Sequence, residues 1–531
     1  MTLMAQAIEY RRLRAPQVDG GTLIDPPPAA VSDLLELNQA LRARWGWIAT
    51  DARRELVAAA TRYTRQYRDV AEPSLDAPIL IAGHQPQMFH PGVWYKNFVL
   101  GRIAQEHRSV AVNLVIDSDA MRSAAIRLPT GPLANPMVET IAFDRAGGET
   151  PYEEHSIIDR EMFCSFGTRV MQTMESLVPN PLIRDFWPLV IERGREQKNL
   201  GLALSQARHR VEGQWGNHTL ELPQSRLCEF PSFRRFAHGL LSEASRLREH
   251  YNQAVSEYRR ANHIRSKAHP VPDLLAADGW IEAPFWVWTS QEPRRRRLFV
   301  RRSGNALRLS DRGELDLSLA VSHESAFEQF ESLERRGIKL RTRALMTTMF
   351  ARLMLGDLFL HGIGGAKYDQ VTDAIIRRYF GIDPPAFMTV TATLRLPVAR
   401  PDACEDDLRL VEQRLRELEF HAERWLDASD ATAQSSTVQS AIAEKLRWIA
   451  TPQNHQNARA RCQAIRRANQ ALQGNLAKFR TSLVAERESL RHDLRVEKAI
   501  GSREYAFCLH PAEKLRELIA SPGDVRQNSS R

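Results

Sequence analysis

Residues 78–119 constrain the fold of this chain more than any other stretch. The apolar run Ile79–Ile81 stops at Gly83, a helical pattern follows Pro91, and a second apolar run, Val110–Ile116, ends in acidic residues. A strand, loop, helix and strand of these lengths predict a βαβ unit, whose two strands must be parallel. We therefore expect an α/β fold built around a parallel sheet.

Polar side chains follow both predicted strands. His84 comes directly after Gly83, and Asp117 and Asp119 close the second strand. Ligands of parallel sheets bind outside the carboxyl ends of the strands, so these residues predict an active site. His84 could act as a general base, because histidine titrates near neutrality, and a purely structural role is the alternative.

The two aspartates allow several interpretations. Asp117 and Asp119 would share a face if the strand continued, since they lie two residues apart. They could then orient a substrate amine, hold ribose hydroxyls or coordinate Mg²⁺ between phosphates. Aspartates in this position also cap helices, which is the structural alternative. A transition-metal site that adds His84 and His90 is the weakest interpretation, and we predict no such site.

A helix is predicted to begin at His90-Pro91-Gly92. Its N-terminal N–H groups and its dipole favour an anion, so His90 could contact a phosphate, and a capped helix with a surface histidine is the alternative. Lys96 and Asn97 fall in the first turns of this helix, where Lys96 could reach an anionic group. Gly83, Gln85 and Gly92 complete the set that we predict to bind substrate or nucleotide here.

A second glycine-rich segment follows the apolar stretch Leu345–Leu360. We predict that His361–Gly365 is a glycine loop and that a helix runs from Lys367 to Tyr379, closed by Gly381. Glycines permit close backbone approach or positive φ, and a tight chain reversal is the alternative. The residues that we predict to bind substrate or nucleotide in this segment are Gly364, Gly365, Lys367, Tyr368 and Asp369.

Composition predicts a cytoplasmic protein. Hydrophobic residues make up 43% of the 531 residues and charged residues 26%, and no run approaches the ~20 apolar residues of a membrane span. The five cysteines include no C-x-x-C pair, so we expect free thiols. The chain also lacks a Walker A pattern and a G-x-G-x-x-G after a strand, which argues against P-loop and dinucleotide sites.

The net charge of +9 includes a local arginine cluster, Arg294–Arg297 with Arg301 and Arg302. It lies in a predicted β-hairpin that turns at Ser303-Gly304-Asn305. The cluster is either a solvated surface or a contact for an anion or RNA. No known nucleic-acid-binding motif accompanies it, so nucleic acid is not the partner that the sequence favours.

The sequence pattern divides the chain into four parts. We expect a leader and helices over residues 1–75, the leader irregular as far as the prolines at 26–28. A core follows over 76–397 with an insertion at about 180–320, then a helical coiled-coil domain over 398–500. A closing segment over 501–531 includes a disordered tail, residues 521–531. Strand pattern is clear at Trp280–Thr289, and helical pattern at Asn180–Val211 and Phe233–Asn262.

Apolar residues at spacings of three and four predict one antiparallel pair of helices in the coiled-coil part, interrupted by a polar loop at Asp427–Thr437. Such helices could pack within one chain or join two copies in a homodimer. The apolar residues are Leu408, Val411, Leu415, Leu418, Ala422, Trp425, Leu472, Leu476, Phe479, Leu483, Leu490 and Leu494.

Three blocks together resemble a known family. They are GHQPQMFHPGVWYKNFVLGRIA with VNLVIDSD, then ALMTTMFARLMLGDLFLHGIGGAKYDQVTDAIIRRYFGI, then the helical pair followed by REYAFCLHPAEKLRELI. In kind and order they are similar to the bacillithiol-biosynthesis cysteine-adding enzymes, the BshC family of cysteine ligases, over most of residues 76–519. The resemblance implies a Rossmann-like core of the class I nucleotidyltransferase kind, with insertions and a C-terminal antiparallel coiled-coil domain.

The resemblance also implies an activity. The family joins cysteine to a malate-linked glucosamine, so we expect a carbon–nitrogen ligase-like enzyme with a small anionic substrate. His84, His90, Asp117 and Asp119 would form its centre, and ATP or ADP with Mg²⁺ are the candidate cofactors. The alternatives are a non-catalytic protein that binds a nucleotide or metabolite, and an RNA-binding protein that uses the arginine hairpin.

The sequence departs from the family at the expected centre. Family members usually end the second strand with Glu-Asp-His-Asp, whereas this chain has Asp117-Ser118-Asp119, which keeps only the last aspartate and lacks the histidine. The first loop has His84-Gln85 where the family commonly has glutamine and glycine, and the Lys-Met-Ser-Lys-Ser run of class I synthetases is missing. We therefore expect a distant member with an altered substrate or altered chemistry.

Overall fold

The computed structural model describes residues 8, 10, 13–426 and 435–521. Most of the polar loop predicted at Asp427–Thr437 and all but the first residue of the tail predicted to be disordered lie outside the described residues. The chain forms two compact units. The first contains residues 1–130, 138–397 and 503–531, and the second contains residues 131–137 and 398–502.

The first unit is built on a six-stranded sheet in the order β1–β14–β13–β2–β3–β6. The βαβ prediction is confirmed, because β2 (Ile79–His84) and β3 (Val110–Val115) pair in parallel and α3 (Pro91–Glu106) connects them. Three further strands run parallel to these two, namely β6 (Leu220–Pro223), β13 (Leu358–His361) and β14 (Phe387–Ala392).

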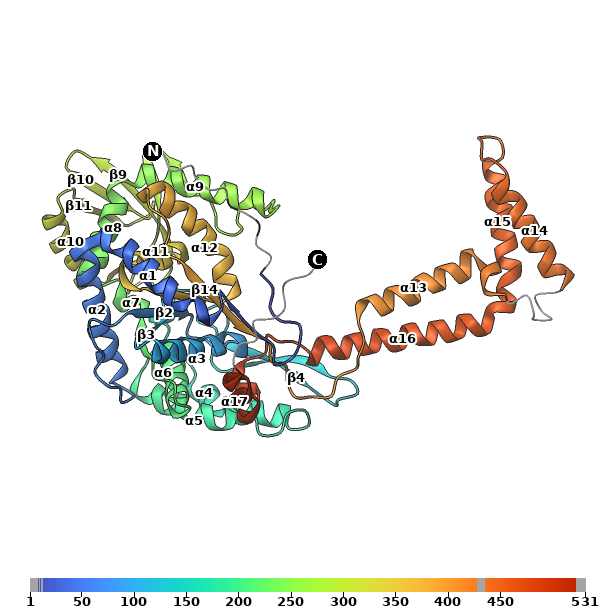
Figure 1. Cartoon of the computed structure of the whole chain (residues 1–531), viewed down its shortest axis with the longest axis horizontal. Helices are drawn as coiled ribbons and strands as arrows, with labels where there is room; N and C mark the ends of the chain where they lie inside the picture. The colour runs from blue at the N-terminus through green and yellow to red at the C-terminus, as the bar shows by residue number, and fades with distance from the viewer. Residues whose placement is uncertain (1–7, 9, 11–12, 427–434, 522–531) are drawn as a thin grey trace. The chain divides into compact units, whose positions relative to one another are not determined.

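The sheet reverses its direction of growth between β2 and β13. From β2 the chain crosses to β3 on one side, and from β13 it crosses to β14 on the other side, through α12 (Ile363–Ile375). Right-handed crossovers in opposite directions place α3 and α12 on opposite faces, as Figure 1 shows. The loops that follow β2 and β13 therefore leave the sheet at the same edge, from neighbouring strands.

The prediction of an irregular leader is wrong for four residues. Thr22–Asp25 form β1, which pairs antiparallel with β14 from Thr22 opposite Ala392 to Asp25 opposite Thr389. Only Ile24 gives this strand a buried apolar side chain, so the segment is too short for an alternating pattern to be recognised. The predicted helices follow as α1 (Val31–Arg42) and α2 (Gly46–Thr64).

A second, antiparallel sheet lies within the core segment, in the order β11–β10–β9–β8–β12 with β7 beside β8. The strand at β8 (Trp280–Thr289) is confirmed, as is the hairpin of β9 (Arg296–Ser303) and β10 (Ala306–Ser310), where Gly304 supplies a positive φ of 59°. The other elements of this sheet are β7 (Ala276–Ala277), β11 (Asp316–Ala320) and β12 (Ile338–Thr342).

Each of two stretches that were predicted to be helical contains two helices. Asn180–Val211 contains α5 (Ile183–Glu196) and most of α6 (Leu200–Gln214), and Phe233–Asn262 contains most of α8 (Pro231–Ser242) and α9 (Ala244–Ala261). The connection between α5 and α6 is only three residues long, and its Asn199 caps α6. The remaining elements of the first unit are β4 (Ala125–Thr130), β5 (Met137–Ala142), α4 (Arg160–Met174), α7 (Gln224–Leu227), α10 (His323–Arg335), α11 (Ala344–Phe350) and α17 (Ala512–Ala520).

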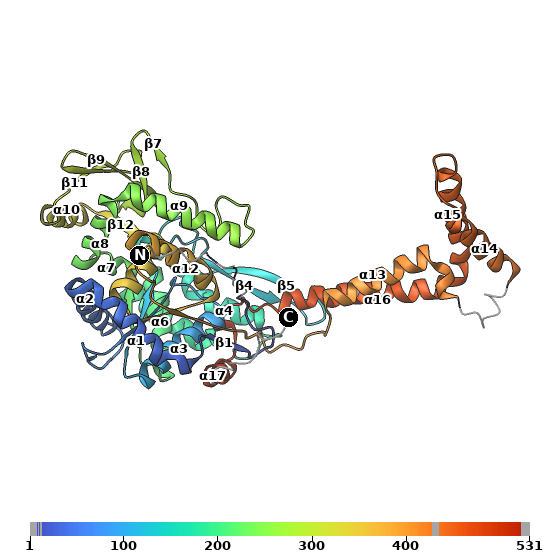
Figure 2. The same cartoon turned by 45° about the horizontal axis from the view of Figure 1, so that its top comes forward.

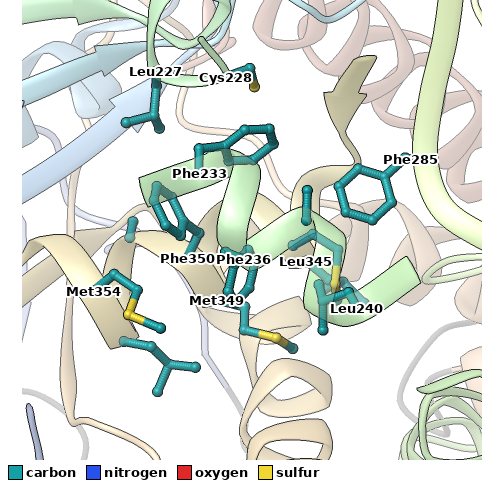
Figure 3. Packing of buried hydrophobic residues seen from close by; sticks show 14 of the residues in the cluster. Leu227, Cys228, Phe233, Phe236, Leu240, Phe285, Leu345, Met349, Phe350 and Met354 are labelled. Carbon is teal, nitrogen blue, oxygen red and sulfur yellow. The ribbon is translucent and has the colours of Figure 1, made fainter. Parts of the chain in front are cut away.

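One continuous apolar core joins the two sheets to α2, α8, α9 and α11. Figure 3 shows part of it, where Phe233 and Phe236 of α8 meet Phe350 of α11 with ring centroids 5.5 and 5.1 Å apart. The apolar stretch that begins at Leu345 therefore serves packing: α11 continues through a π-helical turn, Ala351–Leu355, and then enters β13.

The predicted glycine loop after β13 is shorter than expected. Helix α12 begins at Ile363 rather than Lys367, so Gly364 and Gly365 lie in its first turn and only Gly362 links it to the strand. The predicted end is confirmed, since Gly381 follows the helical segment in the left-handed conformation, with a φ of 67°.

The described residues of the second unit form four α-helices in two pairs rather than one antiparallel pair. Helix α13 (Glu405–Phe420) packs along α16 (Ala477–Ile500), and α14 (Ser436–Ala450) packs along α15 (Ala458–Gln473). Figure 2 shows both pairs. Most of the predicted apolar positions are buried or partly buried here, but Phe479 is 50% exposed.

No helix in the described part of the chain has the length and apolar character that crossing a membrane requires.

Candidate site at the carboxyl edge of the sheet

The structure brings the predicted residues around positions 84 and 119 together at the carboxyl edge of the sheet, where β2 and β3 end. We call this place the rim. His84 at the end of β2 lies opposite Val115 at the end of β3. Beyond these strand ends, the Gln85 side-chain amide donates a hydrogen bond of 3.0 Å to Asp119 Oδ2. The backbone N–H of Ile116 donates to the His84 carbonyl at 2.9 Å, which extends the ladder into the turn. The two chain segments are therefore held together at the edge where both strands finish.

His84 is half-buried, and its Nδ1 atom lies 3.3 Å from the Gln85 carbonyl. Burial, helped by the nearby charge of Lys96, lowers the pKa of His84 to about 3. The imidazole is therefore neutral at neutral pH. A base with so low a pKa accepts protons weakly, so this environment favours hydrogen bonding to a ligand over the general-base role that we predicted.

His90 is the N-cap of α3. Its Nδ1 atom accepts a hydrogen bond of 3.1 Å from the Gly92 backbone N–H, and burial lowers its pKa to about 4. The side chain thus satisfies a donor that an anion would otherwise use. The capping interpretation therefore describes this helix better than the predicted phosphate contact.

Asp117 and Asp119 do not share a face, because β3 ends at Val115 and both residues lie in the turn beyond it. Asp117 is buried and accepts hydrogen bonds from the backbone N–H and hydroxyl of Ser225, at 2.8 and 2.5 Å. Burial and the nearby Glu153 carboxylate raise its pKa to about 7. Asp117 therefore acts on the first turn of α7, and of the two only Asp119 reaches the rim.

Asp119 has a second partner that the sequence did not predict. Arg295 donates a hydrogen bond of 2.7 Å to Asp119 Oδ1, across 176 positions of sequence. The Arg295 guanidinium also lies over the Trp286 ring, 5.0 Å from its centroid, and Arg343 lies 4.2 Å from the same centroid. The second sheet thus contributes two arginines and a tryptophan beside the rim.

The arginine cluster of the hairpin is largely paired with acidic side chains. Arg296 bonds to Glu292 and Asp311, and Arg297 lies 3.5 Å from Glu282. With Arg295 on Asp119, three of the four consecutive arginines have carboxylate partners. This arrangement weakens the interpretation of the hairpin as an RNA contact.

Lys96 and Asn97 face the interior rather than an external anion. Lys96 is 1% exposed, and its Nζ atom donates to the Gly83 carbonyl at 3.2 Å. Burial lowers its pKa to about 7. Asn97 donates to Glu212 at 2.9 Å. Both predicted contacts to a ligand would require these side chains to move.

Beneath the rim lies a buried ionic network on α6 and β6. Arg208 bonds to both Glu212 and Glu221, and all three side chains are buried. His209 brings a third ligand-type side chain, so that His209, Glu212 and Glu221 could in principle hold a metal ion. The Arg208 guanidinium already provides the positive charge between the two carboxylates, although the Glu212 Oε2 atom is buried without a hydrogen-bond partner among the described residues.

On the other side of the rim, the residues after β13 form a separate polar cluster. His361 Nε2 lies 2.8 Å from Asp369 Oδ2, and Asp369 is buried against Arg352. The Arg352 and His361 partners hold the pKa of the Asp369 carboxyl well below its usual range. The predicted binding residue Asp369 is therefore an internal partner, whereas Tyr368 is exposed and Lys367 is half-buried.

The N-terminus of α12 differs from that of α3, because its N-cap residue Gly362 makes no side-chain cap. A Cβ atom at Gly364 would meet no atom within 4 Å, whereas a Cβ at Gly365 would lie 2.7 Å from His361 Nδ1. The first glycine thus faces open space and the second allows the helix to approach His361.

This difference predicts opposite effects of two neighbouring substitutions. Gly364→Ala should raise the free energy of unfolding by up to ~1 kcal/mol, because alanine is the better helix former. Gly365→Ala should lower it by about 1–3 kcal/mol, because the added methyl group displaces His361 from Asp369. Urea unfolding of the two variants checks this, and equal effects of the two would contradict the close contact at Gly365.

The C-terminal segment covers the loop before α3. The Phe507 backbone N–H donates to the Phe89 carbonyl at 2.8 Å, and the Phe507 ring lies 4.4 Å from that of Trp94. Cys508 Sγ lies 3.7 Å from Met88 Sδ, and Glu504 lies 3.8 Å from His90. This segment belongs to the third of the blocks that resemble the BshC family, and it thus packs beside the rim.

Gly92 is also explained by close packing. A Cβ at this position would clash with the Ala392 carbonyl and lie 2.8 Å from the Arg503 guanidinium.

Two residues beside the rim, Arg295 and Phe507, were not among the predicted site residues. Their sequence signals were weak, because Arg295 lies in a run of arginines and Phe507 lies in an apolar segment near the end.

Comparisons with known proteins do not assign the chain: no family model and no curated protein matches it.

Proposed function

We propose that this protein is a carbon–nitrogen ligase-like enzyme of the cytoplasm, distantly related to the BshC cysteine ligases. It would join an amino acid such as cysteine to an anionic small metabolite, of which a sugar–malate conjugate is the nearest known example. The reaction would occur at the carboxyl edge of β2 and β3, with His84 and Asp119 beside the substrate.

The observation that carries this proposal is the reversal of the sheet between β2 and β13. Counted in chain order, the parallel strands β2, β3, β6, β13 and β14 lie in the spatial order 3-2-1-4-5. This is the order of the Rossmann-like folds that the family resemblance implies, and ligands of such folds bind at the reversal. His84 ends β2 at that point, Gln85 follows it, and Gly362 follows β13.

Three groups at this edge suit an anionic substrate. Arg295 and Arg343 lie on Trp286, and each already has a carboxylate partner, Asp119 for Arg295 and Glu282 for Arg343, which a substrate carboxylate would have to replace. The neutral imidazole of His84 can donate or accept a hydrogen bond. Asp119 is partly exposed, so its carboxylate can accept a hydrogen bond from a substrate amine if Gln85 or Arg295 gives way. Arginine recognises carboxylates in two-pronged geometry, which suits a malate-like group.

The fit to a nucleotide is better at α12 than at α3. Helix α3 is capped by His90, whereas α12 has no side-chain cap and has open space at Gly364. Backbone N–H groups at such a helix start favour phosphate, with Lys367 one turn further on. Bound ATP would activate a carboxyl group for attack by an amine.

The residues that we predicted for Mg²⁺ do not fit the ion. Asp117 is bonded to Ser225 and its pKa is raised to about 7, and Asp119 is bonded to Gln85 and Arg295. Neither carboxylate is available as a ligand in this arrangement. We assign no step to Mg²⁺.

The helical unit fits the coiled-coil domain of the proposed family. Apolar residues at spacings of three and four bury Val411, Leu418, Leu472 and Leu483 between its helices. We propose that it is a coiled coil and that it could also join two copies of the chain.

A non-catalytic binding protein is the second candidate. The observation that favours it is the structural use of the predicted catalytic side chains: His90 caps α3 and Asp117 caps α7. Such a protein would keep the rim as a binding site for a nucleotide or metabolite and would release no product.

One experiment separates the two candidates. The protein is incubated with cysteine, the glucosamine–malate conjugate and ATP, and mass spectrometry detects a condensation product together with AMP, ADP or pyrophosphate. The His84→Ala variant should lose product formation by about 10²–10³-fold, the range for losing one hydrogen-bonding group that stabilises the transition state. His455→Ala, which replaces an exposed histidine of the second unit, is the matched control.

Thermal unfolding of the same samples gives the second readout. A product that His84→Ala abolishes and His455→Ala preserves would support the ligase. Stabilisation by a substrate or nucleotide without any product, unaffected by His84→Ala, would support the binding protein and overturn the ligase.

A further inference from the structure

A large cavity lies away from the carboxyl edge, between the start of α2, helices α8 and α10, and the segment that precedes β14. Its volume is about 940 Å³, which is at the upper end of the range for small-molecule sites. None of the residues placed at the proposed ligase centre lines it. The cavity therefore requires an explanation of its own.

Six aromatic side chains contribute to the walls of the cavity. The Trp45 and Phe380 rings meet edge to face, 5.2 Å apart, and Tyr379 also meets Phe380 edge to face, at 4.8 Å. Phe236 and Met354, which Figure 3 shows in the packed core, complete the apolar lining on the inner side. Edge-to-face walls of this kind favour a flat ring system over a purely aliphatic ligand.

The rim of the cavity carries one arginine without an acidic partner. Arg235 is half-buried, and its guanidinium lies over the rings of Trp47 and Phe327, 4.6 and 5.9 Å from their centroids. In the part of the chain that the structure describes, no carboxylate lies within ion-pair distance of it, whereas the neighbouring Arg234 bonds to two glutamates. Arg235 is thus held in place by rings and keeps its hydrogen-bond donors for another group.

The other charges of the rim limit the ligand to a single negative charge. Arg246 is paired with Glu243 at 2.6 Å, so these two cancel. Glu324 and Glu328 are exposed on α10 and would repel an anion with several charges. A single carboxylate or sulfonate directed at Arg235 is repelled less by these two glutamates than an anion with several charges.

Gly239 keeps the cavity open from within α8. A Cβ atom built on it would meet nothing within 4 Å, although the residue lies inside the helix and lines the cavity. A larger side chain at position 239 would therefore start in open space beside the cavity. Glycine here costs up to ~1 kcal/mol of helix stability relative to alanine.

We propose that this cavity binds a ring-bearing organic monoanion, with its rings between Trp45, Phe236 and Phe380 and its acidic head on Arg235. This is a second small-molecule site, and it does not depend on the proposed ligase activity.

The test uses two fluorescent probes that share the same rings. The sulfonate 8-anilino-1-naphthalenesulfonate carries the anionic head, and N-phenyl-1-naphthylamine lacks it. Titrations are made on the full chain and on Arg235→Met, Gly239→Trp and Gly239→Ala, with thermal unfolding to show that each variant is folded. Gly239→Leu replaces the tryptophan variant if that variant does not fold.

The expected pattern separates the head from the rings. Arg235→Met should weaken sulfonate binding about tenfold, the effect of losing one charge-assisted pair worth about 1.4 kcal/mol, and change binding of the neutral amine by less than about twofold. Gly239→Trp should weaken both probes and Gly239→Ala neither. Unchanged sulfonate binding in Arg235→Met would overturn the assignment of the head, and unchanged binding of both probes in Gly239→Trp would overturn the site.

Competition identifies the body of the ligand. 2-Naphthoate should displace the sulfonate probe at lower concentration than dodecanoate, because its rings match the edge-to-face walls. More effective displacement by dodecanoate would overturn the ring-bearing class.

Discussion

Replacing Arg208 with methionine should lower the free energy of unfolding by about 3–5 kcal/mol, the cost of breaking a buried ion pair by removing one partner. Arg208 is 4% exposed and bonds to Glu212 and Glu221, which are both fully buried. Methionine fills much of the same space but leaves two carboxylates without their cation. Urea unfolding of the variant and the wild-type protein measures the difference.

Two further variants identify the cause of this loss. Arg210→Met removes an arginine from the same helix whose partner, Glu192, is about half exposed, so it should cost less than about 1 kcal/mol. Adding Glu212→Gln and Glu221→Gln to Arg208→Met should restore part of the lost stability, because the uncompensated charges are gone. If the triple variant is as unstable as Arg208→Met, the loss comes from packing and the electrostatic explanation is wrong.

The ionic network also shows why part of this site could not be read from the sequence. The βαβ unit was predictable because its apolar runs have strand length and its strands are buried on both faces. Arg208 lies instead in a helix whose pattern gives no sign that a charged side chain points inward. Its partner Glu212 is buried against Trp94 and Asn97 of α3, and its partner Glu221 lies on β6, so the network depends on tertiary packing.

The rim illustrates the same limit. The meeting of His84 and Asp119 follows from the topology of parallel strands, which the sequence pattern indicates. The contact of Asp119 with Arg295 spans 176 positions and depends on where the second sheet packs. A short local pattern is also misleading here: two aspartates two residues apart suggest a shared face, but the strand ends before them, and a turn directs Asp117 inward.

The second large effect concerns Lys96 and depends on pH. Its ammonium is buried beside β2, and burial lowers its pKa from 10.5 to about 7. Between pH 10.5 and pH 7 the unfolded chain therefore binds a proton at this lysine that the folded chain does not. The contribution of this lysine to stability is therefore fully present above pH 10.5, the pKa of the lysine in the unfolded chain. It is lost as the pH falls from 10.5 to about 7, the pKa in the folded chain.

Lys96→Met removes this dependence. Relative to wild type, the variant should become more stable as the pH is lowered from 9.5 to 6.5, by up to about 4 kcal/mol on the conversion of pKa shifts to free energy. The pH dependence of Asp117 is common to both proteins and largely cancels in the comparison. Lys198→Met replaces an exposed lysine of the same unit and is the control. Its free energy of unfolding relative to wild type should differ between pH 9.5 and pH 6.5 by less than about 0.5 kcal/mol.

The outcome also bears on the chemistry of the rim. The Lys96 charge contributes to the low pKa of His84, so Lys96→Met should raise the pKa of His84 in an NMR titration, although burial still holds it below 6.5. With a pKa of about 7, Lys96 would be present as both ammonium and amine at neutral pH, so it could exchange a proton with the neighbouring groups. If the stability difference between Lys96→Met and wild type is instead the same at pH 6.5 and 9.5, the ammonium stays charged in the fold, and proton exchange at this edge must involve other groups.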